Sequence, residues 1–177
     1  MMPYDNFGSL PSVGGEALID SGADRCVLGP EFLVESYSNR TSSVHGLADN
    51  PVMQNHPVGI GLGAIRTINN IIIIIRICEA VLECPVSVLS VNQMRSYGVE
   101  VNDVPRRYGG SQCLVLSESQ IIQLKYLRAM IYLKVRTPTR EELRSCRIVT
   151  ITSPNQGRPL VDESNDDLNF LYEEHDI

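Results

Sequence analysis

The sequence predicts a mostly β protein with two or three short helices, and three observations lead to this fold class. Segments of strand-like composition, rich in Val, Ile, Leu and Tyr, follow one another at short intervals. The consecutive isoleucines at 71–75 are β-branched and unalternating, which is typical of a buried strand. Turn residues such as Asn69-Asn70 separate these segments. With 177 residues, 43% of them hydrophobic, the chain has room for one domain with a usable core.

The first segments predict two short strands. Residues 14–20 are expected to form a strand that ends at Asp20, since three apolar residues lead into that carboxylate. Val27-Leu28 predict a second strand, which Gly29-Pro30 stops.

Polar connections and a hairpin are expected next. Residues 30–36 ("PEFLVES") predict a single helical turn, because proline is favoured at the first helical position. Residues 36–43 are rich in Ser, Asn and Thr and predict a loop. Residues 43–67 have apolar segments on both sides of a turn-rich middle near 49–55, which predicts a long hairpin.

The second half predicts further short strands and two short helices. Residues 80–94 indicate a strand that Pro85 breaks, followed by a helix around 92–97 that Gly98 caps. The spacing from Thr139 to Glu142 fits a capping box for a small helix through Cys146. Four more segments have strand-like composition: 99–105, 112–117, 120–126 and 129–136.

The net charge of −6 resides at the C-terminal end. Residues 151–177 hold seven acids against one base, Arg158, and 14 acids balance 14 bases in residues 1–150. We therefore expect a neutral body with a disordered acidic tail at 151–177. A basic patch large enough for nucleic acid is not indicated, so no nucleic-acid partner is expected.

The five cysteines make no Cys-x-x-Cys pair and predict reduced thiols in a cytosolic or nuclear setting. His45, His56, Cys78 and Cys84 lie at spacings that match no zinc-ligand pattern, so neither a metal nor another cofactor is expected. The apolar run that contains the isoleucines is too short to cross a bilayer, and the N-terminus lacks the pattern of a signal peptide. No membrane partner is therefore expected.

The stretch "ALIDSGADRCVL", residues 17–28, is the most informative in the chain. Asp-Ser-Gly by itself is a common surface turn, in which Asp and Ser side chains bond nearby backbone N–H groups. Here two apolar residues precede it, Ala23 and Asp24 follow it, and Val27-Leu28 come two residues later. A surface turn does not require these particular neighbours, so the whole stretch is more specific than Asp-Ser-Gly alone.

These residues resemble the signature region of the retropepsins, the aspartic proteases of retroviruses and retrotransposons. Residues 88–109 ("LSVNQM" within them) are similar to the stretch that follows the protease strands in copia-type retrotransposon polyproteins. The likeness covers roughly residues 14–150. It implies a retropepsin-like acid-protease barrel with one lobe per chain. On this resemblance the chain divides into a flexible lead-in at 1–13, a retropepsin-like protease domain at 14–108, a C-terminal β/helical extension at 109–150 and the disordered acidic tail at 151–177.

The resemblance also assigns roles to the loop residues. Asp20 is the catalytic carboxylate, and an aspartic protease needs two of them sharing a proton to activate a water on the scissile peptide. Gly22 supports the loop by permitting a tight turn, and Ser21 by hydrogen bonding across the two-fold axis. Small Ala23 leaves space for substrate, and Asp24 contacts substrate backbone or braces the dimer.

A homodimer follows from the count of motifs, since the chain holds a single Asp-Ser-Gly and the second carboxylate must come from a second copy. The resemblance further implies a flap, a hairpin that closes over substrate between residues 44 and 65. Two tips stay open: Gly46 with Leu47, or the strand with Gly59, Gly61 and Gly63. The turn residues favour the first, with the three glycines on the returning strand, and those glycines are equally consistent with a bulged strand that has no active role.

The pattern departs from the family beneath the catalytic loop, among other places, and the sequence leaves two functions open. Retropepsins usually have two hydrophobic residues and a glycine beneath the catalytic loop, where this chain has Val88-Leu89-Ser90. The first hypothesis is a dimeric aspartic endopeptidase that processes a retroelement polyprotein, cytoplasmic or within retroelement particles. The alternative is an inactive retroelement remnant that serves as a dimerisation or peptide-binding module. Cys26, beside Val27-Leu28, is expected to be a buried, unreactive thiol.

Overall fold

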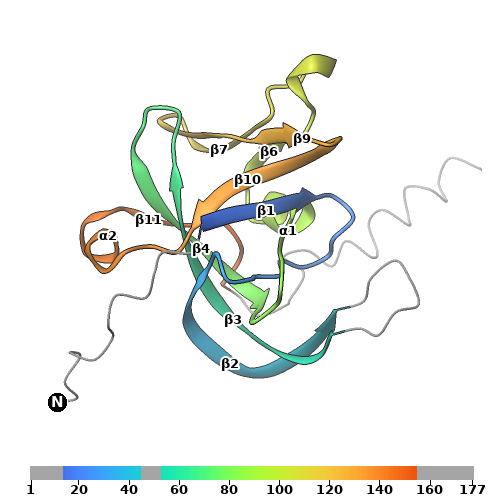
Figure 1. The fold of residues 1–177 in the computed structure, drawn as a ribbon, viewed down its shortest axis with the longest axis vertical. Coiled ribbons are helices and arrows are strands. Elements are labelled where there is room, and N and C mark those ends of the chain that lie inside the picture. Colours follow the sequence, from blue (N-terminus) through green and yellow to red (C-terminus); the bar gives the residue numbers. More distant parts are fainter. Residues whose placement is uncertain (1–13, 45–52, 155–177) are drawn as a thin grey trace, which may run out of the picture.

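The computed structural model describes residues 14–44 and 53–154, and within them the protein is mostly β, as the sequence predicts (Figure 1). A short 3₁₀ helix spans Arg106–Tyr108. The other elements are, in chain order, β1 (Gly14–Asp20), β2 (Leu33–Val44), β3 (Met53–Arg66), β4 (Ile72–Val81), β5 (Ser87–Ser90), α1 (Val91–Ser96), β6 (Glu100–Asn102), β7 (Cys113–Ser117), β8 (Gln120–Gln123), β9 (Lys125–Leu127), β10 (Met130–Arg136), α2 (Arg140–Ser145) and β11 (Ile148–Thr150).

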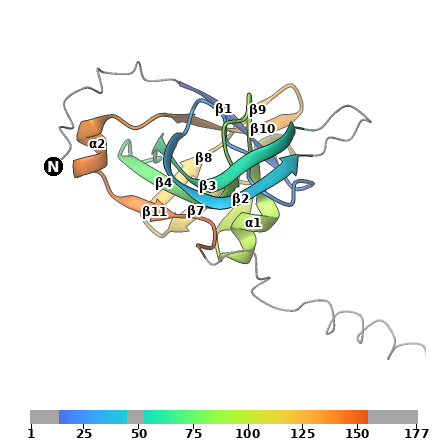
Figure 2. The same ribbon diagram turned by 90° about the horizontal axis from the view of Figure 1, so that it is seen from below.

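Eight of these strands belong to one sheet. Its order is β11-β4-β3-β10-β1-β5, with β2 also paired to β3 and β9 to β10, whereas β6, β7 and β8 form a separate sheet. Figure 1 shows the long β2–β3 hairpin at one end of the molecule and β6, β7 and β9 at the other, with β1 and β10 between them. The two helices lie well apart, as the view from below also shows (Figure 2). Residues 109–150, the predicted extension, thus contribute β10 and β11 to the sheet that holds β1.

Four of the five isoleucines, residues 72–75, begin β4 as predicted, whereas Ile71 precedes the strand and is 58% exposed. Ile73, Ile74, Ile75 and Ile77 are all 2% exposed or less. β4 is antiparallel to β3, and β11 pairs in parallel with residues 74–76 of β4. Ile73, Ile74 and Ile75 are all buried although adjacent residues point to opposite faces of the sheet, so both faces are covered here and the sequence needs no polar alternation.

The chain from 30 to 43 differs from the prediction. The helical turn expected at 30–36 and the loop expected at 36–43 are wrong, because β2 begins at Leu33 and runs along β3 to Val44. Its polar side chains find partners far away in the sequence: the Arg40 guanidinium contacts both carboxylate oxygens of Glu79, at 2.7 and 2.8 Å. Pairing of this kind overrides the loop-like composition, and composition alone cannot reveal it.

The capping box predicted at Thr139 is confirmed at the start of α2. The Thr139 hydroxyl accepts a hydrogen bond from the Glu142 backbone N–H, and the Glu142 carboxylate accepts one from the Thr139 N–H. The Arg136 guanidinium donates two more to Glu142, at 2.6 and 2.7 Å. These donors, Arg136 first, lower the pKa of the Glu142 carboxyl to about 2.

We expect Glu142 to make folding stability pH-dependent in the acid range. Because its folded pKa is depressed, the ionised carboxylate stabilises the fold above its ordinary pKa of 4.5, and this contribution is lost as the pH falls towards about 2. Urea unfolding should therefore show wild type more stable than Glu142→Gln at neutral pH, with the gap closing between those values. Glu141→Gln, exposed on the same helix, is the control. A gap for Glu142→Gln that stays constant with pH would contradict the ion pair's role.

Candidate catalytic loop

Asp20 lies at the carboxyl end of β1. Ala17 and Ile19 are buried, whereas Asp20 is half-buried, because successive side chains of a strand point to opposite faces. β1 runs between β10, which is antiparallel to it, and β5, which is parallel. The parallel register sets Asp20 beside Ser90, the last residue of β5. A carboxylate at the end of an apolar strand is thus held at a fixed place with part of its surface open to solvent.

The turn after Asp20 closes on the carboxylate. The Gly22 backbone N–H donates a hydrogen bond to Asp20 Oδ1 at 2.7 Å. A Cβ atom on Gly22 would lie 3.2 Å from that oxygen, so the glycine keeps the close approach free of crowding. Ser21 and Asp24 are exposed and Ala23 is half-buried. The structure therefore brings the predicted loop residues together around Asp20, with two polar side chains facing solvent.

Three polar side chains at the β5–α1 junction hold this loop from beneath. The Ser90 hydroxyl donates to the Ala23 carbonyl oxygen at 2.6 Å, and the Asn92 amide donates to the Ser21 carbonyl oxygen at 2.9 Å. The Gln93 side-chain oxygen accepts from the Cys26 N–H at 2.7 Å. The resemblance places Val88-Leu89-Ser90 beneath the loop, but the hydrogen bonds that Ser90, Asn92 and Gln93 make with it were not predicted. The feature of the sequence that could have indicated these contacts is the set of polar residues beside the buried Val91 and Met94.

The contacts of Ser90 explain why this chain has a serine where retropepsins usually have a glycine. Its hydroxyl also accepts a hydrogen bond from the Gln93 N–H at 3.0 Å, which makes Ser90 the N-cap of α1. One fully buried hydroxyl therefore starts the helix and anchors the loop. A serine N-cap contributes about 1 kcal/mol, which glycine would supply only in part.

After the loop, the chain runs along the edge of β5 that faces away from β1. Val27 and Val88 exchange two backbone hydrogen bonds of 2.8 Å, so β5 lies between β1 and the Val27 segment. Val27 packs with Val81 and Cys84, and the half-buried Val44 and Val88 complete this cluster, here called the valine wall. Val44 is the last residue of β2, so this end of β2 packs against the cluster. Val27, Val81 and Cys84 are buried, and Val44 and Val88 are the half-buried members of the valine wall.

The two flap candidates fall in different parts of the structure. Gly46 and Leu47 lie outside the described residues. Gly59, Gly61 and Gly63 lie within β3, the returning strand, and are buried there. A Cβ atom on Gly61 would come within 2.3 Å of a Leu28 methyl group, so packing explains this glycine. The ladder with β4 is irregular between Gly59 and Gly61, as expected for a bulged strand.

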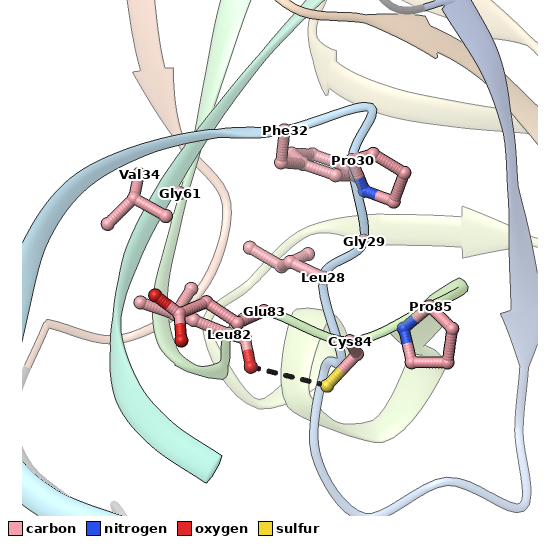
Figure 3. Close-up of a pocket in the computed structure, with 10 residues that line it drawn as sticks. All are labelled: Leu28, Gly29, Pro30, Phe32, Val34, Gly61, Leu82, Glu83, Cys84 and Pro85. Carbon is pink, nitrogen blue, oxygen red and sulfur yellow. Dashed lines mark hydrogen bonds between the residues drawn. The ribbon is translucent and has the colours of Figure 1, made fainter.

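A separate apolar pocket of about 370 Å³ lies between the segment after Val27 and the loop that follows β4 (Figure 3). Leu28 and Phe32 point into it from one side and Leu82 from the other, and the Cys84 thiol is turned to the Leu82 carbonyl oxygen, 3.4 Å away. Adjacent residues of an extended segment face opposite sides, so Leu28 looks into this pocket and Val27 into the valine wall. Residues 20–26 do not line the pocket.

Cys26 is buried, as predicted. Burial raises the pKa of its thiol to about 12, and the hydrogen bond from the Ser90 N–H, 3.3 Å from the sulfur, only partly opposes this. A thiol in this state is a poor nucleophile, since the thiolate is the reactive form. Within the loop, the buried Cys26 thiol is enclosed, whereas the half-buried Asp20 carboxylate is open to solvent.

Within residues 14–44 and 53–154, no group of three or more His, Cys, Asp and Glu side chains is placed to hold a metal ion. No helix in these same residues is long and apolar enough to span a membrane. Comparisons with protein-family models, curated proteins and solved structures find no match to this chain.

Proposed function

We propose that the protein is an aspartic endopeptidase of the retropepsin kind, whose active centre forms between two copies of the chain. One observation carries the proposal: Asp20 stands half-buried at the end of a strand, on a tight loop that Ser90 and Asn92 hold from beneath while Ser21 stays exposed. The loop is thus fixed in itself and open towards a partner. On this proposal each chain is one lobe of an acid-protease barrel.

The place of Val88-Leu89-Ser90 supports this assignment. The resemblance puts a hydrophobic pair and a small residue beneath the catalytic loop, and β5 lies there, paired to β1 and bonded to the loop through Ser90. Leu89 is fully buried under the loop's two flanking segments. The serine replaces the glycine of the family without loss of this support, because its hydroxyl is taken up by the Ala23 carbonyl and the Gln93 N–H.

Two such loops would supply the chemistry of peptide hydrolysis. When the carboxylates of the two Asp20 residues are brought close together, they cannot both be ionised. The pair therefore shares one proton. The ionised member takes a proton from a bound water, which attacks the peptide carbonyl, and the protonated member donates a hydrogen bond to the carbonyl oxygen. When the tetrahedral intermediate collapses, the C–N bond breaks and the amine leaves with the proton that the first carboxylate took from water. Val88, a half-buried member of the valine wall two residues before Ser90, offers an apolar contact for substrate side chains beside this centre. The substrate on this proposal is a retroelement polyprotein, cut in the cytoplasm.

A mixing experiment tests whether one centre needs two chains. Wild-type protein is equilibrated with increasing amounts of the Asp20→Asn chain at a fixed wild-type concentration, and peptide cleavage is followed. Since random pairing puts half of the wild-type chains into mixed dimers at equal amounts, activity should fall to about one half, and to about one quarter at threefold excess.

The Asp103→Asn chain, altered outside the loop, is the control and should not lower the activity. If the Asp20→Asn chain leaves activity unchanged, the centre lies within single chains and the proposal fails. If the chains pair but neither wild type nor mixture cleaves peptides, the protein is the dimerisation or peptide-binding module instead.

A further inference from the structure

A basic groove lies at the end of the molecule away from the catalytic loop. It has a volume of about 810 Å³ and is found at the start of β1, where Gly14 and Gly15 meet the end of β3, the end of β8 and β10. Its apolar lining includes Ala64, Ile65 and Val135. Nothing in the proposed peptidase chemistry uses this groove, since Asp20 lies at the opposite end of β1.

Cations rim the groove. Arg66, Lys125, Lys134 and Arg136 line it against a single acid, Glu16. Lys125 pairs with Glu16 and Arg136 pairs with Glu142. In the part of the chain that the structure describes, no carboxylate pairs with Arg66 or Lys134.

The excess positive charge is a property of the fold. Arg66 comes from β3, Lys125 from β9 and Lys134 from β10, and the pairing of β3 and β9 with β10 gathers them. A fifth base, Arg106, donates to the Gln123 side chain in the lining. The groove therefore suits an acidic ligand that also carries apolar side chains.

Residues 155–177 of this chain have that composition. Asp162, Glu163, Asp166, Asp167, Glu173, Glu174 and Asp176 stand there against one base, Arg158. Leu168, Phe170, Leu171 and Tyr172 lie between the acids. Charge and hydropathy thus complement those of the groove.

The chain is long enough to reach it. The Thr152 hydroxyl and the Cys78 backbone bond each other at 2.7 and 2.8 Å, which fixes where the described chain ends. Ile72, at the other end of β4, lines the groove, and six residues of strand span about 20 Å. The twelve residues from 155 to 166 can span roughly 40 Å when extended. Asp166 and Asp167 can therefore reach the groove.

We propose that residues 155–177 dock in this groove of their own chain, with their acids against Arg66 and Lys134 and their apolar residues on the floor. The acidic segment is then a ligand of the fold, and it protects a basic cavity from other polyanions. This docking does not depend on Asp20 or on dimerisation.

Zero-length carbodiimide coupling of the full chain tests the proposal, because the protein has two lysines, Lys125 and Lys134, and both line the groove. The Lys125–Glu16 pair is an internal positive control for the folded groove. Mass spectrometry should find Lys134 coupled to an acid of 155–177. Arg66→Gln should lower the yield of that product several-fold and leave the Lys125–Glu16 product unchanged, while Arg144→Gln, exposed on α2, should change neither.

Two results would overturn the proposal. The first is the Lys125–Glu16 product without coupling of Lys134 to the segment; photocrosslinking of a short oligouridylate to β10 in that sample would assign the groove to nucleic acid. The second appears when isotope-labelled and unlabelled chains are mixed. Products that join a labelled to an unlabelled chain would mean that the segment docks on another copy.

Discussion

Replacing Asp20 with asparagine should abolish peptide cleavage while the fold and the dimer persist. Asn has the same shape and retains an oxygen that can accept the hydrogen bond from the Gly22 N–H, so the loop should keep its geometry. The amide cannot take up a proton from water, and the loss of general acid–base chemistry predicts a rate lower by roughly 10³-fold or more. Chromatography of peptide products measures the rate, and sedimentation together with circular dichroism reports dimer and fold.

The matched change is Asp103→Asn, which also converts a carboxylate to an amide. Asp103 pairs with Arg95 on α1 and has no contact with the loop. Its variant should cleave at a rate within about twofold of wild type, since surface ion pairs contribute little. An Asp20→Asn protein that still cleaves at the wild-type rate would remove Asp20 from the chemistry.

Replacing Leu89 with alanine should cost about 2–5 kcal/mol of the free energy of unfolding, the range for buried leucines. Leu89 is fully buried in β5, between β1 and the Val27 segment, and the loop with Asp20 crosses over that strand. The cavity would lie directly under the loop, so cleavage should weaken with stability. Urea unfolding followed by circular dichroism gives the free energy.

Leu127→Ala makes the same chemical change on the surface. Leu127 is 46% exposed in β9, and its truncation should change stability by less than about 0.5 kcal/mol. Equal losses for the two variants would show that β5 is not the packed support that the structure describes.

Local patterns in the sequence predicted most elements. The isoleucine run, the capping box at Thr139 and the helix ended by Gly98, which has φ of 88°, all depend on neighbouring residues, and all are confirmed. The hairpin predicted at 43–67 is confirmed in its returning strand, β3, whereas its first arm overlaps β2 only at residues 43–44 and its tip lies outside the described residues.

What the sequence could not reveal depends on residues far apart. β2 has the composition of a loop and is a strand because it pairs with β3. The anchors Ser90 and Asn92 act on a loop about 70 positions earlier, as the separations of 67 and 71 residues show. The basic groove was equally hidden, since the bases that form it balance acids elsewhere and the body of the chain is neutral as a whole.

The partners of β1 set the order in which the loop that carries Asp20 is completed. β1 is translated before its neighbours β5 and β10, and Ala17 pairs with Leu133. Contacts over such separations form late, because the intervening loop must close first. During synthesis on the ribosome, Asp20 emerges long before the strands that hold it. A nascent chain therefore carries an unfinished loop until β5 and β10 have left the exit tunnel, and on the proposed function it should not cleave peptides before then.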